Sequence, residues 1–125
     1  MKIRILVLTA LMAFLNGPAV QAHHAGTAFD STVQLTIAGT IKEFKWVNPH
    51  IWAILEVPDE NGNIVEWKLE GGSVSILGRS GWNSKSLQPG DKVTVTVSPL
   101  RSGEPGGEFH TFTKEDGTVL GMQMR

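Results

Sequence analysis

The chain contains no cysteine. In an oxidising compartment this absence excludes disulfides, thiolate metal sites and a cysteine nucleophile, so the fold must be held together by core packing. An excess of charge is also missing, because 11 basic residues face 12 acidic ones and the formal net charge is −1. Nucleic acids and anionic lipids favour clustered Lys and Arg, so this balance argues against either as a partner.

Catalytic patterns are scarce as well. The sequence has no Gly-x-Ser-x-Gly motif, and Gly71-Gly72-Ser73 lacks the lysine and the spacing of a phosphate-binding loop. We therefore expect no catalysis. Beyond residue 22 no segment is long and apolar enough to cross a bilayer, so we expect no stable membrane span in the mature protein.

The N-terminus has the layout of a secretory signal. Lys2 and Arg4 precede an apolar run from Ile5 to Leu15 that is too short to span a membrane, and small residues end at Ala22. We predict a signal peptide over 1–22, cleavage after Ala22 and export to a bacterial periplasm, which suits a domain without disulfides. Roughly 100 residues would remain, enough for one domain. We divide them into an arm, 23–32, and a single domain, 33–125.

The first part of the domain predicts a three-stranded antiparallel meander over 33–70. Apolar residues alternate from residue 33 and change phase, which indicates a bulge or bend near 39–43. A second strand, 50–57, and a third, 64–70, flank Asn61-Gly62, a strong hairpin signal. We expect Val65, Trp67 and Leu69 to be buried.

The second part predicts a short helix, capped by Ser73, that runs to about Ser80. A fourth strand over 93–97, a mobile glycine-rich loop over 102–107 and a fifth strand over 109–113 follow, and the chain then turns back into 118–122. This order predicts an all-β, mainly antiparallel fold: an OB-like five-stranded barrel with one short helix between strands three and four. An immunoglobulin-like sandwich is the alternative, although it would require more strands and no helix there.

Four histidines are the candidate metal ligands. Cleavage after Ala22 would give His23 a free amine beside its imidazole, and a third imidazole would complete a nitrogen site that suits Cu(II). His24, His50 and His110 are the further candidates. The alternative interpretation is an unliganded polar arm, since chain ends are usually disordered, with His110 as an exposed strand residue.

A candidate ligand-binding face lies around the connection between the first two strands. In OB barrels this loop borders the binding face. Trp46 and Trp52, which flank Asn48 and His50, could stack on a flat or sugar-like ligand, and Trp82 is a further candidate. The structural alternative is that the tryptophans fill the core and that Asn48 stabilises a turn.

Six segments carry a resemblance to a known family: Ala22-His23-His24, Phe29-Asp30, Gly39-Thr40-Ile41, Trp46-Val47-Asn48-Pro49-His50 as the most specific part, Gly81-Trp82, and Leu87-Gln88-Pro89-Gly90-Asp91-Lys92-Val93. Together they resemble a family of small exported bacterial proteins, the domain of unknown function number 6152. The resemblance covers nearly the whole mature chain and implies an exported, OB-like single domain, but no established reaction, ligand or catalytic residue. Members often read His-His-Ser after the signal, whereas Ala25 follows the pair here.

The sequence thus predicts an exported periplasmic binding or accessory module, whose ligand is an unknown small molecule or a periplasmic protein partner. The alternative function is a Cu(II)-binding protein that uses the processed His23-His24 terminus. Copper is the one cofactor that the residues suggest.

Overall fold

The computed structural model describes residues 27–122. The predicted signal peptide, its cleavage after Ala22, and the candidate ligands His23 and His24 lie outside the described residues. Within them, no helix is long and apolar enough to cross a membrane.

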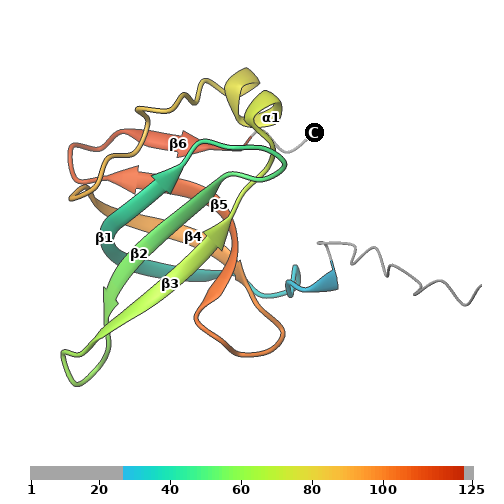
Figure 1. The fold of residues 1–125 in the computed structure, drawn as a ribbon. Helices are drawn as coiled ribbons and strands as arrows, with labels where there is room; N and C mark the ends of the chain where they lie inside the picture. Colours follow the sequence, from blue (N-terminus) through green and yellow to red (C-terminus); the bar gives the residue numbers. More distant parts are fainter. Residues whose placement is uncertain (1–26, 123–125) are drawn as a thin grey trace, which may run out of the picture.

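Six strands and one helix follow one another along the chain (Figure 1). The three-stranded meander and the short helix after it are where the sequence predicts them. The elements are β1 (Leu35–Lys45), β2 (Trp52–Pro58), β3 (Ile64–Glu70), α1 (Val74–Arg79), β4 (Lys92–Pro99), β5 (Gly106–Lys114) and β6 (Val119–Gly121).

Pairing between distant strands closes the sheet into a barrel. β1 pairs antiparallel with both β2 and β4, β2 with β3, and β4 with β5. A parallel seam between β3 and β5, from Lys68 opposite Gly106 to Glu70 opposite Glu108, completes the ring. β6 pairs antiparallel with β5 over Thr111 to Thr113, beyond the part of β5 that pairs with β3. The predicted OB-like five-stranded barrel is therefore confirmed, and the sandwich alternative is wrong.

The first strand bends so that it can serve two neighbours. Its pairing with β2 shifts register between Ile41 and Glu43, within the interval where the sequence predicts a bulge. Before the bend β1 pairs mainly with β4, and after it β1 pairs with β2. At Gly39 a Cβ atom would lie 2.6 Å from the backbone oxygen of Glu56, so this close crossing of strands requires glycine.

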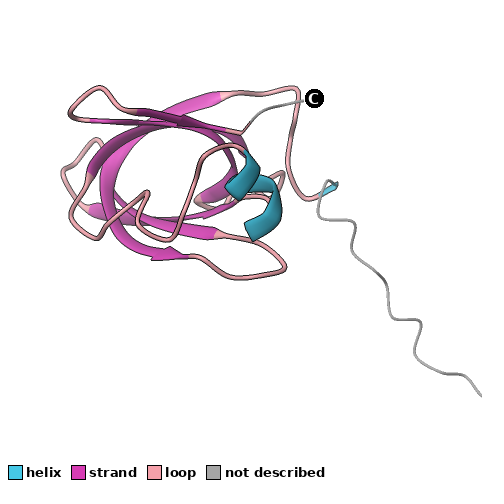
Figure 2. Ribbon diagram, turned by 90° about the horizontal axis from the view of Figure 1, so that it is seen from above, coloured by secondary structure: helices cyan, strands magenta, loops and turns pink. Residues whose placement is uncertain are grey.

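The core fills the barrel and is sealed at one end by the segment that contains α1. Seen from above, the strands form a ring and α1 lies on its near end (Figure 2). The Ser73 side chain caps the helix by accepting a hydrogen bond from the Ile76 N–H, as predicted. The buried cluster comprises Ile41, Ile51, Ala53, Leu55, Leu69, Leu77, Trp82, Leu87, Val93, Val95, Val97, Phe109 and Phe112.

Two local predictions are corrected. The segment 102–107 is not wholly a loop, because Gly106 and Gly107 begin β5 and pair with β3. A Cβ at Gly107 would lie 2.4 Å from the backbone oxygen of Ser98, so glycine here permits close approach of two strands. Leu69 is buried as expected, but Trp67 and Val65 are only partly buried, since they lie toward the open end of the barrel.

Candidate functional site

His50 is the predicted site residue that the structure places most informatively. It directly precedes the buried Ile51, and its side chain is 40% exposed. Its Nδ1 lies 3.1 Å from the backbone oxygen of Gly71 and 3.2 Å from Oε1 of Glu70. Both neighbours are acceptors, so we assign the Nδ1 proton as their donor, and in the neutral ring Nε2 is then the acceptor.

The partner of His50 is a carboxylate withdrawn from water. The Glu70 side chain is 14% exposed. Burial raises the pKa of Glu70, while the positive charge that His50 can carry lowers it and the nearby Glu108 raises it further. The net direction is upward, so Glu70 holds its proton more tightly than an exposed glutamate does.

A row of side chains crosses the outer face of the barrel at this level. Backbone pairing aligns Lys45 of β1 with Trp52 of β2, and Trp52 with Glu70 of β3. It then aligns Glu70 with Glu108 of β5. Side chains directly opposite each other on antiparallel strands have Cβ atoms about 4.5–5.5 Å apart. Trp52 therefore has a cationic neighbour on one side and the His50–Glu70 pair on the other.

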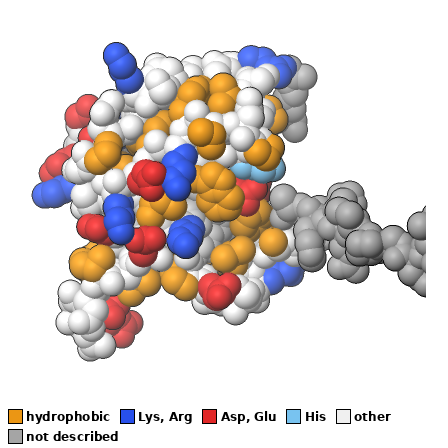
Figure 3. All heavy atoms as spheres, viewed as in Figure 1, with side chains coloured by type: hydrophobic (Ala, Val, Ile, Leu, Met, Phe, Trp, Pro, Cys, Tyr) orange, Lys and Arg blue, Asp and Glu red, His pale blue; other side chains and the backbone are white. Residues whose placement is uncertain are grey.

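The next row down the same face is also apolar in the middle. Ile54 alternates with the core residues Ala53 and Leu55, so it points outward, yet its exposed fraction is only 7%. Its cross-strand neighbours are Glu43 and Lys68. Figure 3 shows this face over β1–β3, with hydrophobic side chains among charges of both signs. We call the set Lys45, His50, Trp52, Ile54, Lys68 and Glu70 the outer face.

Three further predicted site residues have structural contacts. Trp82 is only 3% exposed, and its Nε1 donates to the backbone oxygen of Gly121 at 3.0 Å. Trp46 is partly buried against the core, with its ring centroid 6.1 Å from that of Phe44. Asn48 is exposed, and its Oδ1 accepts a hydrogen bond from the N–H of Val74 at the start of α1.

The tryptophan pair imagined from sequence, Trp46 with Trp52, is therefore divided between the core side and the outer side of the barrel wall. Trp52 was among the residues predicted for this surface, whereas Glu70 and Ile54 were not. The alternation of β3 already indicated that Glu70 faces outward; its proximity to His50 depends on the register of β2 against β3.

His110 is not a simple exposed strand residue. It is the extra residue of a bulge in β5, because Thr111 lies opposite Thr96 whereas Phe109 lies opposite Val97. Its Nε2 lies 2.7 Å from Oγ of Ser98.

This serine–histidine contact resembles part of a hydrolytic site only superficially. Ser98 is 3% exposed, which keeps its hydroxyl from a substrate. The other ring nitrogen of His110, Nδ1, is buried and has no hydrogen-bond partner within 27–122. A carboxylate that would orient the ring as in a triad is thus missing from the described part of the chain. We interpret the pair as a polar contact between β4 and β5.

No cluster of three or more His, Cys, Asp or Glu residues within 27–122 is arranged to hold a metal ion. His50 and His110 instead contact groups of the barrel itself. The predicted copper site would depend on His23 and His24, which lie outside the described residues, so it stays a prediction.

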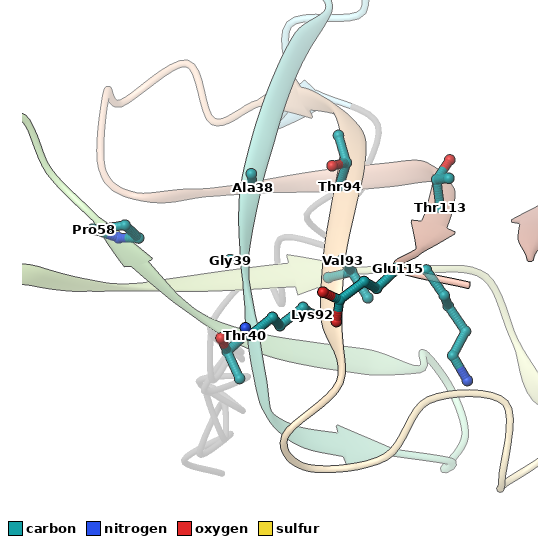
Figure 4. Close-up of a pocket in the computed structure, with 10 residues that line it drawn as sticks. Ala38, Gly39, Thr40, Pro58, Lys92, Val93, Thr94, Thr113 and Glu115 are labelled. Atoms are coloured by element: carbon teal, nitrogen blue, oxygen red, sulfur yellow. The ribbon is translucent and has the colours of Figure 1, made fainter. Parts of the chain in front are cut away.

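A recess on another face is lined mostly by short side chains. It has a volume of about 410 Å³ and lies over β1, β4 and β5, with Ala38, Thr94 and Thr113 along it and Pro58 at one side (Figure 4). Its charged members have both signs: Lys92 and Lys114 lie beside Glu115, and Lys114 pairs with Asp91 at 3.3 Å. Without an aromatic side chain or a dominant charge, the recess favours no particular ligand.

Comparison with known families decides the chain's relationship. Residues 11–109 match the model of a family described as "Family of unknown function (DUF6152)". The chain belongs to this family. No curated protein and no solved structure matches the chain. Membership in DUF6152 confirms the resemblance given by the sequence segments, and it assigns no ligand or reaction to the outer face.

Proposed function

We propose that the protein is an exported, non-catalytic binding module of the bacterial periplasm that holds a partner protein against its outer face. The observation that carries this proposal is the position of Trp52, partly buried in the middle of the outer face and flanked by Lys45 and Glu70. The fold is consistent with it, because OB barrels commonly bind over strands two and three between the loops at their edges.

The shape of this surface favours a protein over a small molecule. Small ligands are usually held in concave sites, and the recess over β1, β4 and β5 lies on another face of the barrel. Protein interfaces concentrate their binding energy in a few central residues, often Trp, surrounded by contacts that exclude water. Trp52 and Ile54, two residues further along the same side of β2, fit such a centre. The charged side chains around them fit its rim.

The charges would determine the orientation of the partner. Glu43 and Lys45 on β1, and Lys68 and Glu70 on β3, place charges of both signs on the two sides of β2, so a complementary surface must present the opposite pattern. Exposed charges of this kind affect the association rate and specificity more than the final affinity. Binding is therefore expected to slow as salt concentration rises, while the apolar contact of Trp52 persists.

In-cell crosslinking tests the proposal directly. A photo-crosslinking amino acid would be placed at position 45, whose side chain is 47% exposed, or at position 119, an exposed position on β6. We expect one discrete crosslinked product from position 45 in exported protein, and its loss when Trp52→Ala is added. Val119→Ala is the matched control, because Val119 is 62% exposed and remote from β2. Equal products from both positions, or a product that survives Trp52→Ala, would contradict the proposal.

The export and copper predictions share one measurement. Intact-mass spectrometry of secreted protein should give a mature chain that starts at His23, and spectra with and without Cu(II) should report metal uptake. A mature chain that starts at Met1 would refute export by cleavage and remove the terminal chelate. If copper binds through the terminus, His23→Ala should change the electron paramagnetic resonance spectrum, whereas an unchanged spectrum would exclude His23 as a ligand.

A further inference from the structure

A second concave surface lies at the end of the barrel opposite α1. The β2–β3 hairpin and the β4–β5 loop extend there side by side (Figure 1), and a groove of about 410 Å³ separates them. It is distinct from the outer face, with which it shares no residue. We call it the hairpin groove, and it is lined by Val57, Pro58, Asp59, Glu60, Val65, Trp67, Gly103 and Pro105.

The floor of the hairpin groove is apolar and supported from behind. Trp67 and Val57 pack against the core cluster on one side, yet Trp67 remains partly exposed. Val65 is on the same side of β3 as Trp67, and Pro105 closes the opposite wall. The backbone oxygen of Pro105 accepts a hydrogen bond from the Lys68 N–H at 3.3 Å, which fixes the β4–β5 loop to β3.

The charge of the groove has one sign. Among residues 27–122, Asp59 and Glu60 are the only ionisable residues that line it, and no Lys, Arg or His of this part of the chain does so. Asp59 is held in place because its Oδ1 accepts hydrogen bonds from the N–H groups of Asn61 and Asn63, each at 2.8 Å. A fixed negative charge therefore lies at the mouth of a site whose floor is an indole ring.

We infer that the hairpin groove binds a small organic cation: an amine or quaternary ammonium group attached to a short apolar chain. The apolar chain would lie on Val57, Val65 and Pro105. The cation would lie near the Trp67 ring and the carboxylates, because indole faces attract cations and quaternary ammonium groups especially. The groove has the volume of a small-molecule site. This site is independent of the proposed function.

Three probes with the same six-carbon chain separate the contribution of the cationic group from that of the apolar chain. Hexyltrimethylammonium, hexyl sulfate and 1-hexanol would each be titrated into the full-length mature protein, below any micelle-forming concentration. Amide and indole N–H resonances would be followed by NMR, with Gly103 as the reporter common to all variants. We expect saturable shifts at Gly103 and Trp67 with hexyltrimethylammonium, weaker shifts with hexanol and none with hexyl sulfate. Equal responses to the cation and the anion, or shifts that do not saturate, would overturn the inference.

Two variants test the residues. Trp67→Leu keeps an apolar floor but removes the ring, so the Kd for hexyltrimethylammonium should rise about tenfold while that for hexanol changes little. If Trp67→Leu fails to fold, Glu60→Gln keeps the test open, because its exposed side chain carries no packing. Glu60→Gln should raise the Kd for hexyltrimethylammonium several-fold. Glu115→Gln, outside the groove, should leave this Kd unchanged. Unchanged affinity in Glu60→Gln, or a lysine peptide that binds where hexyltrimethylammonium does not, would refute the small-cation site.

Discussion

Adding one methyl group at Gly71 should damage the core beneath the outer face. A Cβ atom there would lie 2.2 Å from Cζ and 2.5 Å from Cε1 of Phe109. Phe109 is fully buried, and its ring packs against Phe112 and Trp82 at centroid distances of 5.1 and 5.6 Å. The ring therefore has no open space into which it could move, and the clash must be relieved by distorting the core.

Gly71→Ala is accordingly expected to destabilise the protein. Overpacking of a dense core typically costs about 1–3 kcal/mol, and for a domain of this size each kcal/mol corresponds to roughly 4–8 °C in Tm. Urea unfolding followed by tryptophan fluorescence would measure the free energy, and a thermal melt by circular dichroism would give the Tm. Because Gly71 also accepts the His50 hydrogen bond, the His50 imidazole resonances should shift.

The same substitution in α1 is the matched control. At Gly78 an added Cβ would meet nothing within 4 Å, and the residue lies in the helix. Gly78→Ala should therefore stabilise the protein by about 0.5–1 kcal/mol. The double variant Gly71→Ala/Phe109→Leu replaces the obstructing ring with a smaller side chain. Its loss of unfolding free energy should be smaller than the sum of the losses in the two single variants. Wild-type stability in Gly71→Ala, or strict additivity in the double variant, would refute the packing argument.

Two further changes test the end seal and the outer face. Trp82→Phe removes the Nε1 donor to the Gly121 carbonyl and should cost about 1–3 kcal/mol, with faster amide exchange in β6; unchanged exchange there would show that β6 does not depend on Trp82. Glu70→Gln should raise the Tm at neutral pH, because the raised pKa of Glu70 means that its ionised form disfavours the folded state. That gain should shrink as the pH falls through the raised pKa toward the ordinary value near 4.5, so a gain that grew in acid would contradict the sign.

The order of the strands could be predicted because the alternation of apolar residues and the residues that form turns are local signals. Asn61-Gly62 marks its hairpin within a few residues, and Gly62 has a φ of +82°, which glycine adopts without strain. The phase change before Glu43 likewise indicated the bulge that the structure contains. Each signal needs only neighbouring residues, so no tertiary contact has to be known in advance.

The structure adds to or departs from the expectations where a residue's position depends on distant strands. Gly106 and Gly107 suggested a mobile loop, yet their lack of a side chain lets β5 approach β3 and β4. Alternation correctly assigned Trp67 to the inward side, but it says nothing about the position along the barrel axis, and this position leaves the ring partly exposed. For Trp82 the sequence left a ligand contact and core packing as alternatives, and the closing of the barrel end places it in the core, 3% exposed.

The candidate site was predictable in part for the same reason. His50 and Trp52 lie close together in sequence, so their grouping could be proposed from the chain alone. Glu70 joins them through the β2–β3 register, and Ser98 meets His110 through a bulge that no local pattern indicated. Neither contact can be inferred from the spacing of these residues along the chain.

The narrow seam between β3 and β5 has a consequence for how the chain folds. The seam joins three residue pairs and brings Lys68 to Gly106 across a separation that contains α1 and all of β4. Hairpins form early because their ends are near in sequence, whereas a long loop must be closed before a distant parallel pair can form. The meander over 33–70 and the β4–β5 hairpin are thus expected to assemble as two separate halves. The halves would join through the β1–β4 pairing, and the last event would be closure of the ring at Gly106 and Gly107. Until then β3 and β5 would each expose an unpaired strand edge to other molecules in the cell.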